Sequence, residues 1–479
     1  MPECILHVTD GNRTSPSFGN SRDSTGYRSP LKVGPVFSDE RLNELASSLF
    51  WALSVEDVTF AFDGPNGLHE RVFPFDPIPR LIPQNEFDRL EEGIKQRVVA
   101  MNMFLQDIYH EGKIFKDKVF SESFLLSSSG YMVEARGITP PKGVFLHLSG
   151  IDLVRAADTW FVLEDNLRVP SGVSYALKAR ELYETCIPDV LAERGVKETL
   201  TFLQNLGKAF SSVNVGGEGV ILSPGRHNAA FFEHGYLAES LGMTLAFGED
   251  LLVYGEDVFL RGCFGKRHKV GFVYKRLNDE YLDPVMFNPA SVIGVPNIYP
   301  IYKKGRVGIG NALGTGVADD KGVFYYTPQI IRYYLGQDPI LPLPPTYLPE
   351  DPKDAAFVFE NMGRLVIKEV NSAGGFGVRF GPRLTKAELA ELKVRIVASP
   401  RGFIAQELLD FEELDVRLQD GTYEKRRADL RMYAVMGEDV SVLRGGLSRF
   451  SGQRGSYLVN SCQGGGYKDT WVYQPAQTA

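Results

Sequence analysis

Two oxygen-bearing side chains end an apolar segment in the first half of the chain. The stretch LEDNLRVPSG places Glu164 and Asn166 two residues apart, so on a β-strand both would face one site while Asp165 faces the other way. Carboxylate and amide oxygens suit magnesium, which completes its shell with water and nucleotide phosphates. Arg168 could hold an anionic group beside that metal. The alternative is that Glu164 and Asp165 are solvated charges at a strand end.

Asp152 could bring a third oxygen to the same place. The segments GVFLHLSGIDLV and WFVLEDN are apolar runs joined by a short polar turn from Ala156 to Thr159, which predicts a β-hairpin. If the turn is odd-numbered and centred on Asp158, Asp152 falls opposite Glu164 on the same face. An even-numbered turn would send Asp152 to the wrong face.

A lysine followed by a glycine-rich loop forms a second candidate site. In RLVIKEVNSAGGFGVRFG, Lys368 ends an apolar strand and a flexible loop follows. Backbone N–H groups of such a loop can lie over phosphates while the ammonium adds a positive charge, which suits ATP. Neither a Walker loop nor a dinucleotide fingerprint occurs, and an ordinary loop is the alternative. The predicted nucleotide-binding residues of this lobe, including two at the end of the strand FIAQELLDF, are Lys368, Ser372, Gly374, Gly375, Gly377, Gln406 and Glu407.

Two further polar, glycine-bearing stretches could contact anions. Lys321, in GTGVADDKGVFYYTP, leads into a helix-like segment and is a second phosphate candidate, although Asp319 and Asp320 could simply cap that helix. Near the end of the chain, YLVNSCQGGGYKDTWV suggests a closing loop, with Lys468 as a candidate for substrate binding. A tight terminal turn is the alternative there.

The elements that would position these residues follow from hydrophobic spacing. Apolar residues recur at steps of three and four from Phe87 to Ile108, with Asn85 placed to cap and Gly112 placed to stop, which predicts an amphipathic helix. Residues 216–310 alternate strand, helix and strand as in a Rossmann-like subdomain with parallel pairing. Ligands gather at the carboxyl ends of such strands, so Arg226 and Asn228 in SPGRHN are substrate-binding candidates.

Domain organisation and partners follow from length and composition. A chain of 479 residues with 43% hydrophobic residues predicts several subdomains: a disordered polar tail over 1–30, a helical region with the hairpin over 31–215, the Rossmann-like part, and a nucleotide-binding lobe with a closing loop over 311–479. A net charge of −8 argues against a dedicated nucleic-acid surface. No apolar stretch of about 18 residues and no signal-peptide pattern are visible, so a cytoplasmic protein without a membrane partner is expected. The oligomeric state cannot be inferred.

Long motifs in a fixed order carry a resemblance to a known family. The motifs QRVVAMNMFLQDIY, GIDLVRAADTWFVLEDNLRVPSGVSY, LSPGRHNAAFFEHGYLAESLG, GTGVADDKGVFYYTPQIIRYYLG, ADLRMY and LVNSCQGGGYKDTWV resemble the circularly permuted ATP-grasp proteins, a bacterial group related to glutathionylspermidine synthetase. The resemblance covers residues 55–473. It implies an α/β fold, a circularly permuted ATP-grasp with a Rossmann-like substrate subdomain.

The resemblance also implies roles for individual residues. By the family pattern Asp152, Glu164 and Asn166 would hold Mg²⁺, Arg168 would meet the reacting anion, and Lys321 and Lys368 would bind ATP phosphates. Asp429 and Arg431 match the family's D-L-R strand, and the loop 372–377 resembles its lid. Glu369 stands where a proline is common, and Arg427 stands where a histidine is expected.

The activity implied is that of an ATP-dependent carboxylate–amine ligase. ATP would phosphorylate a small-molecule or peptide carboxylate, and an amine would attack the acylphosphate to form an amide or peptide bond. Arg168, Lys321, Lys368 and Arg431 are the residues expected to stabilise charge during this reaction. The alternatives are a kinase that releases a phosphorylated product and a nucleotide-binding scaffold without turnover.

Overall fold

The computed structural model describes residues 37–64, 67–196, 199–372, 375, 377–418, 420–459 and 464–474. The predicted tail over residues 1–30 lies outside them. The described residues form a mixed α/β structure with four sheets. No helix among them combines the length and the apolar character that crossing a membrane requires.

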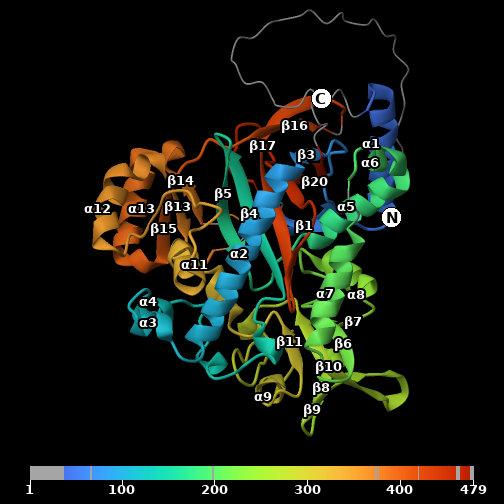
Figure 1. Cartoon of the computed structure of the whole chain (residues 1–479), viewed down its shortest axis with the longest axis vertical. Helices are drawn as coiled ribbons and strands as arrows, with labels where there is room; N and C mark the ends of the chain where they lie inside the picture. Colours follow the sequence, from blue (N-terminus) through green and yellow to red (C-terminus); the bar gives the residue numbers. More distant parts are fainter. Residues whose placement is uncertain are drawn as a thin grey trace, which may run out of the picture.

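An eight-stranded sheet runs through the centre of the molecule (Figure 1). Its main path has the order β3-β20-β19-β17-β4-β5, and β16 and β18 also pair with β17. All pairs are antiparallel except β3 with β20. The strands are β3 (Arg80–Pro83), β4 (Leu148–Ala156), β5 (Thr159–Asn166), β16 (Glu413–Arg417), β17 (Tyr423–Met436), β18 (Val440–Val442), β19 (Leu447–Phe450) and β20 (Gly466–Tyr473). The predicted hairpin therefore shares one sheet with the C-terminal strands, although the two were assigned to different regions of the sequence.

A six-stranded sheet forms the lower part of the molecule in Figure 1. Its order is β7-β6-β10-β9-β8, with β11 also pairing with β10. The strands are β6 (Glu218–Leu222), β7 (Thr244–Ala246), β8 (Leu251–Tyr254), β9 (Asp257–Arg261), β10 (Arg267–Lys275) and β11 (Gly308–Gly310). The predicted strand–helix–strand unit is confirmed, because β6 leads through α8 (Phe231–Ser240) to β7 in parallel pairing.

The nucleotide-lobe segments form an antiparallel four-stranded sheet with the order β12-β15-β13-β14. Its strands are β12 (Thr346–Tyr347), β13 (Leu365–Glu369), β14 (Val378–Phe380) and β15 (Phe403–Glu407). The helices α12 (Pro352–Asn361) and α13 (Lys386–Ala398) lie beside it (Figure 1). Thr385 caps α13 through a reciprocal hydrogen-bond pair with Glu388. A separate hairpin pairs β1 (Thr59–Gly64) with β2 (Gly67–Val72).

The remaining helices surround these sheets. They are α1 (Asp39–Val55), α3 (Lys113–Lys116), α4 (Glu122–Leu126), α5 (Val173–Cys186), α6 (Pro188–Glu193), α7 (Leu200–Ser212), α9 (Ile298–Lys303), α10 (Lys321–Tyr325) and α11 (Thr327–Leu335). The helix-like segment after Lys321 is thus two helices, which meet at Tyr326.

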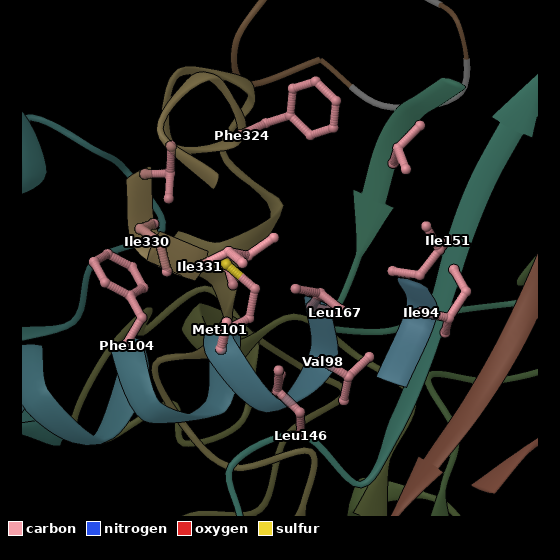
Figure 2. Packing of buried hydrophobic residues seen from close by; sticks show 14 of the residues in the cluster. Ile94, Val98, Met101, Phe104, Leu146, Ile151, Leu167, Phe324, Ile330 and Ile331 are labelled. Carbon is pink, nitrogen blue, oxygen red and sulfur yellow. The ribbon is translucent and has the colours of Figure 1, made fainter. Parts of the chain in front are cut away.

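The long helix α2 (Gln84–Ile108) packs its apolar face against the central sheet and α11. Figure 2 shows Val98 and Met101 of α2 in one cluster with Ile151 of β4 and Ile331 of α11. The predicted helix is confirmed, but the predicted cap is wrong: the N-cap residue is Pro83, so Asn85 lies inside the first turn. Proline fixes an extended φ at the cap and also fills the last position of β3, so the chain turns there without a side-chain cap.

Asp165 joins the hairpin to α2. Its carboxylate receives two hydrogen bonds from Arg97, Nε to Oδ1 at 2.6 Å and Nη2 to Oδ2 at 2.7 Å, and both side chains are at most 2% exposed. The alternation predicted for the strand is thereby confirmed, because Asp165 faces the helix while Glu164 faces a cavity.

Replacing Asp165 with Asn should destabilise the fold strongly. The substitution leaves the buried Arg97 guanidinium uncompensated, so we expect the free energy of unfolding to fall by about 3–5 kcal/mol in denaturant titrations. Asp338→Asn is the matched control, because Asp338 also pairs with an arginine but is 86% exposed. That variant should cost less than about 1 kcal/mol. Equal effects of the two substitutions would contradict the structural role of Asp165.

Candidate active site

The register of the β4–β5 hairpin decides which side chains meet. The turn has two residues, Ala157 and Asp158, both with positive φ (45° and 62°), as type I′ turns require. The premise of an odd-numbered turn is therefore wrong. A β-bulge at Leu163 nevertheless shifts the register by one residue, so that Asp152 pairs with Glu164. The bulge restores the predicted pairing that the turn alone would have prevented.

A cavity of about 730 Å³ brings most of the predicted site residues together. It lies where the hairpin, β17 and β19 of the central sheet meet the nucleotide-lobe strands and the segments around α8 and β10. The predicted residues that line it are Asp152, Glu164, Asn166, Arg168, Asn228, Lys368, Gly375, Gln406, Glu407 and Arg431.

Lys321 reaches this site through Glu164. Its Nζ lies 2.7 Å from Glu164 Oε1 and donates a 2.7 Å hydrogen bond to the carbonyl of Ser372 at the start of the glycine-rich loop. Asp320 caps α10 by accepting from the N–H groups of Gly322 and Val323, which fixes the backbone that carries Lys321. One ammonium thus joins the hairpin to the loop.

Lys368 brings a second ammonium to the cavity from β13, one of the two inner strands of the four-stranded sheet. It pairs with Ile404 of β15 and Val378 of β14. Burial lowers the pKa of Lys368 to about 8, Glu164 opposes this shift, and Lys321 adds to it. The amine is therefore charged at neutral pH but close to its titration range.

Arg168 lies at the end of the hairpin beside Asp319. The N–H groups of Leu167 and Arg168 both donate to Asp319 Oδ1, at 2.5 and 2.9 Å, and the Arg168 Nε lies 3.5 Å from Asp319 Oδ2. Burial raises the pKa of Asp319, and Arg168 acts in the opposite direction. Asp319 thus fixes the backbone at Leu167 and Arg168. This role differs from the cap of the helix after Lys321 that the sequence suggested for Asp319.

Four charged side chains alternate across three neighbouring strands at the cavity wall. Asp152 pairs in register with Arg431, and Asp429 pairs in register with Arg449. Arg431 donates from Nε to Asp152 Oδ1 at 2.6 Å and from Nη2 to Oδ2 at 2.8 Å. Arg449 donates from Nη2 to the same Asp152 Oδ2 at 2.8 Å and also binds both oxygens of Asp429.

This arrangement fixes the ionisation of Asp152. Burial alone would raise its pKa, but Arg431 and Arg449 outweigh burial and hold the pKa of Asp152 well below its usual range. The carboxylate is therefore charged at every pH at which the protein would be studied. Arg449, which lines the cavity, was not among the predicted residues.

The family model for circularly permuted ATP-grasp type 2 proteins matches residues 79–451. The chain belongs to this family. An uncharacterised protein of Synechocystis sp. is 42% identical over 426 residues, covering 87% of this chain and 88% of the relative. A Frankia casuarinae protein provisionally named as a glutamate–cysteine ligase is 36% identical over 447 residues, covering 92% of this chain and 51% of the relative, so the chain spans about half its length. A solved structure, a glutathione synthetase-like effector of Globodera pallida in its apo form, is similar in fold, with a TM-score of 0.55 at 14% identity, covering 92% of this chain and 99% of that chain.

Membership of the circularly permuted ATP-grasp family confirms the predicted fold class and raises the question of a metal. The oxygens of Asp152, Glu164 and Asn166 form a hard donor set of the kind that magnesium prefers. The buried Asn166 side-chain nitrogen has no hydrogen-bond partner among the described residues, so no protein contact fixes which end of the amide faces the cavity. No cluster of three His, Cys, Asp or Glu side chains suited to a metal occurs in the described residues, so this set depends on the amide. With that amide, the donor types fit magnesium, and a bound ion would compete with Arg431 and Arg449 for Asp152 and with Lys321 for Glu164.

Two nucleotide-side candidates, Gln406 and Glu407, line the cavity at the end of β15 of this ATP-grasp protein. Gln406 Nε2 donates to Thr346 Oγ1 at 3.1 Å, and Glu407 pairs with Arg364 at 3.0 Å. In the glycine-rich loop, Gly375 lines the cavity, and the Gly377 carbonyl accepts from the Glu369 N–H at 3.1 Å, which closes the base of the loop. Gly374 lies outside the described residues.

Two predicted substrate residues do not line the cavity. Lys468 is buried away from it, where its ammonium pairs with Asp76 and donates to the Ile78 carbonyl at 3.0 Å. The Arg226 guanidinium lies over the Phe231 ring at 5.4 Å from its centroid. Both were assigned from their place in polar loops, but Lys468 belongs to strand β20 and its partner Asp76 is distant in sequence. Residues 460–463 of the predicted closing loop are not described.

Proposed function

We propose that the protein is an ATP-dependent, magnesium-dependent carboxylate–amine ligase. The proposal rests on one observation: oxygen donors from the β4–β5 hairpin and the Lys368 side chain line one cavity, and Lys321 reaches the same site by pairing with Glu164. Metal ligands and phosphate-binding cations gathered at one cavity are what transfer of a γ-phosphoryl group needs. The ligase name of the Frankia relative supports this class of reaction.

In the proposed reaction a substrate carboxylate attacks the γ-phosphorus, ADP leaves, and an amine then displaces phosphate from the acylphosphate to form an amide. Asp152, Glu164 and Asn166 would hold magnesium. A bound magnesium ion would neutralise part of the negative charge of the ATP phosphates. Lys321 and Lys368 would hold the phosphates. Arg168, Arg431 and Arg449 would stabilise negative charge at the carboxylate and at the transferring group.

Positioning and exclusion of water complete the mechanism. The loop after Lys368 would close over the phosphates and keep water from hydrolysing the acylphosphate. Lys321, which already contacts both Glu164 and the Ser372 carbonyl, would couple closure of that loop to the hairpin. Little covalent chemistry from the protein is required, since alignment of the reacting groups lowers most of the barrier.

The deciding experiment measures ADP formation with magnesium over a panel of amino acids, peptides and amines, with mass analysis of the products. An amide that forms in proportion to ADP supports the proposal. Release of a phosphorylated acid without amide would indicate the kinase alternative, and nucleotide binding without ADP formation would indicate the scaffold.

None of the relatives reported above is named as a glutathionylspermidine synthetase, so that relation stays a prediction from the sequence.

Nucleotide affinity should fall as pH rises through the pKa of Lys368, about 8. Only the protonated amine attracts phosphate; this form predominates well below pH 8, makes up about half of the population at pH 8 and is lost progressively above it. If ATP binds only the charged form, the affinity should fall by about tenfold per pH unit above 8. Calorimetric titration with a non-hydrolysable ATP analogue from pH 7 to 10 measures this.

Lys368→Arg provides the control for the pH profile. Arginine keeps its charge throughout this range, so the variant should bind the analogue with an affinity that no longer falls above pH 8. A parent protein whose affinity is flat between pH 7 and 10 would contradict contact between Lys368 and the phosphates.

A further inference from the structure

Arg401 joins the four-stranded sheet of the nucleotide lobe to segments outside that sheet. It lies in the short turn Pro400–Gly402 between α13 and β15, and its side chain is 16% exposed. Its Nη2 donates to Asp320 Oδ2 at 2.8 Å, and its Nη1 donates to Asp320 Oδ1 at 3.3 Å. Such a forked pair fixes the direction of both side chains as well as the distance between them.

Two further contacts hold the same guanidinium. Its Nε donates to Ser127 Oγ at 3.0 Å, and its central carbon lies over the Phe124 ring, 3.9 Å from the centroid. The Ser127 hydroxyl donates to the Phe124 carbonyl at 2.7 Å, so its oxygen accepts from Arg401. Phe124 and Ser127 lie at the end of α4, and Asp320 is the N-cap of α10. Arg401 therefore contacts two helices that do not belong to the four-stranded sheet.

The carboxylate that binds Arg401 also fixes the backbone of Lys321. Asp320 Oδ1 accepts from the N–H groups of Gly322 and Val323 at 2.7 and 3.3 Å, and the Asp320 side chain is 2% exposed. A Cβ atom on Gly322 would lie 2.7 Å from Arg401 Nη1, so the missing side chain lets the arginine reach the start of the helix. Lys321, the residue after Asp320, therefore leaves α10 in a direction that Arg401 helps to determine.

The turn that carries Arg401 is also bonded to the base of the glycine-rich loop. The Gly402 carbonyl accepts from the Val370 N–H at 2.9 Å, two residues before Ser372. The Ser372 carbonyl accepts from Lys321 Nζ at 2.7 Å. The loop and the start of α10 are thus connected twice, once through the lysine ammonium and once through the ion pair of Arg401.

We propose that Arg401 is a positioning residue for the proposed reaction: its ion pair with Asp320 holds the start of α10 against the nucleotide lobe, so that Lys321 meets the ATP phosphates together with the glycine-rich loop. A lysine ammonium is a point charge on a flexible stem, so its contribution depends on where the backbone places it. Arg401 acts through Lys321, since it is not among the described residues that line the cavity. This proposal rests on the proposed function, because the role of Lys321 follows from it.

A double-mutant cycle tests whether Arg401 acts through Lys321. Calorimetry measures the affinity of the full chain for a non-hydrolysable ATP analogue with magnesium, in the parent, Arg401→Met, Lys321→Met and the double variant. We expect Lys321→Met to weaken binding at least about tenfold, Arg401→Met at least about fivefold, and the double variant to bind within about twofold of Lys321→Met. Losses that multiply in the double variant, or an unchanged affinity in Arg401→Met, would overturn the proposal.

Arg395→Met is the matched control for Arg401→Met. Arg395 lies on α13 of the same lobe and also combines an ion pair with a ring contact: its Nη2 donates to Glu369 Oε1 at 2.6 Å, and its guanidinium lies 5.6 Å from the centroid of the Phe403 ring. Both partners belong to the four-stranded sheet, so any loss of affinity in Arg395→Met should multiply with the loss in Lys321→Met. If the effect of Arg395→Met also disappears in the Lys321→Met background, the specific role of Arg401 is wrong.

Asp320→Asn breaks the same ion pair from its other side and replaces Arg401→Met if that variant does not fold in denaturant titrations. The amide keeps an oxygen for the N–H groups of α10 but removes the charge that binds Arg401. Its loss of affinity, at least about threefold, should again disappear in the Lys321→Met background, and a loss that persists there would overturn the proposal. A parent protein that does not bind the analogue would overturn the proposed function and this role with it, whereas multiplied losses in a parent that binds would overturn only the role of Arg401.

Discussion

The variant Glu164→Gln should lose the magnesium-dependent formation of ADP almost completely. Glu164 is the residue at which the two halves of the site meet, since it faces Asp152 across the hairpin and contacts Lys321 at 2.7 Å. The amide keeps the shape but removes the charge that would hold the metal and orient the lysine. We expect the rate of ADP formation at saturating substrate to fall about a thousandfold, which corresponds to about 4 kcal/mol in the barrier.

The chain offers a closely matched control for this variant. Glu413 on β16 also pairs with a basic side chain, Arg427 at 3.3 Å, and its side chain is 34% exposed against 33% for Glu164. Glu413→Gln should retain the parent rate because this residue does not line the cavity. If Glu164→Gln turns over as fast as Glu413→Gln, the hairpin does not bind the metal, and the proposed mechanism is wrong.

The faces of the hairpin could be predicted from sequence, but its register could not. Alternation of side chains along a strand is a property of local backbone geometry, so the separation of Glu164 from Asp165 followed from their adjacency. The pairing of Asp152 with Glu164 depends instead on a turn and a bulge that compensate for each other. A bulge at Leu163 leaves no distinct signal in an apolar run, and the prediction of this pair relied on a turn that the structure does not contain.

Long-range pairing limits the prediction of charged residues in the same way. Arg449 has no feature in the sequence that separates it from other arginines, and it becomes part of the site only because β19 pairs with β17 and places it opposite Asp429. Conversely, Lys468 follows a glycine run that suggests an open loop, but β20 carries it into a buried contact with Asp76. Local spacing identifies which side chains could do chemistry, and the order of strands in the central sheet decides which of them meet.

Arg449→Lys should reduce the rate of ADP formation by about a hundredfold to a thousandfold while leaving ATP affinity close to that of the parent. Arg449 bridges two carboxylates of the cavity wall, since it binds Asp152 at 2.8 Å and Asp429 at 2.5 Å. A lysine keeps the charge but cannot hold two carboxylates in a fixed planar geometry. If Asp152 held magnesium, Asp429 would still fix the Arg449 guanidinium, which could then face negative charge that develops in the cavity. The Arg449→Lys substitution should therefore lower the rate of the chemical step.

Arg426→Lys separates this role from general stability. Arg426 lies on β17, its side chain is 11% exposed like that of Arg449, and it pairs with Glu424 at 2.7 Å without lining the cavity. Arg449→Lys should lose more unfolding free energy than Arg426→Lys, because its carboxylate partners are buried, and only Arg449→Lys should lose turnover, with the loss in kcat and not in the KM for ATP. Equal loss of turnover in the two variants would mean that Arg449 acts by holding the sheet together. A rise in KM alone would instead place Arg449 in nucleotide binding, so the division between kcat and KM determines what the buried charge cluster contributes.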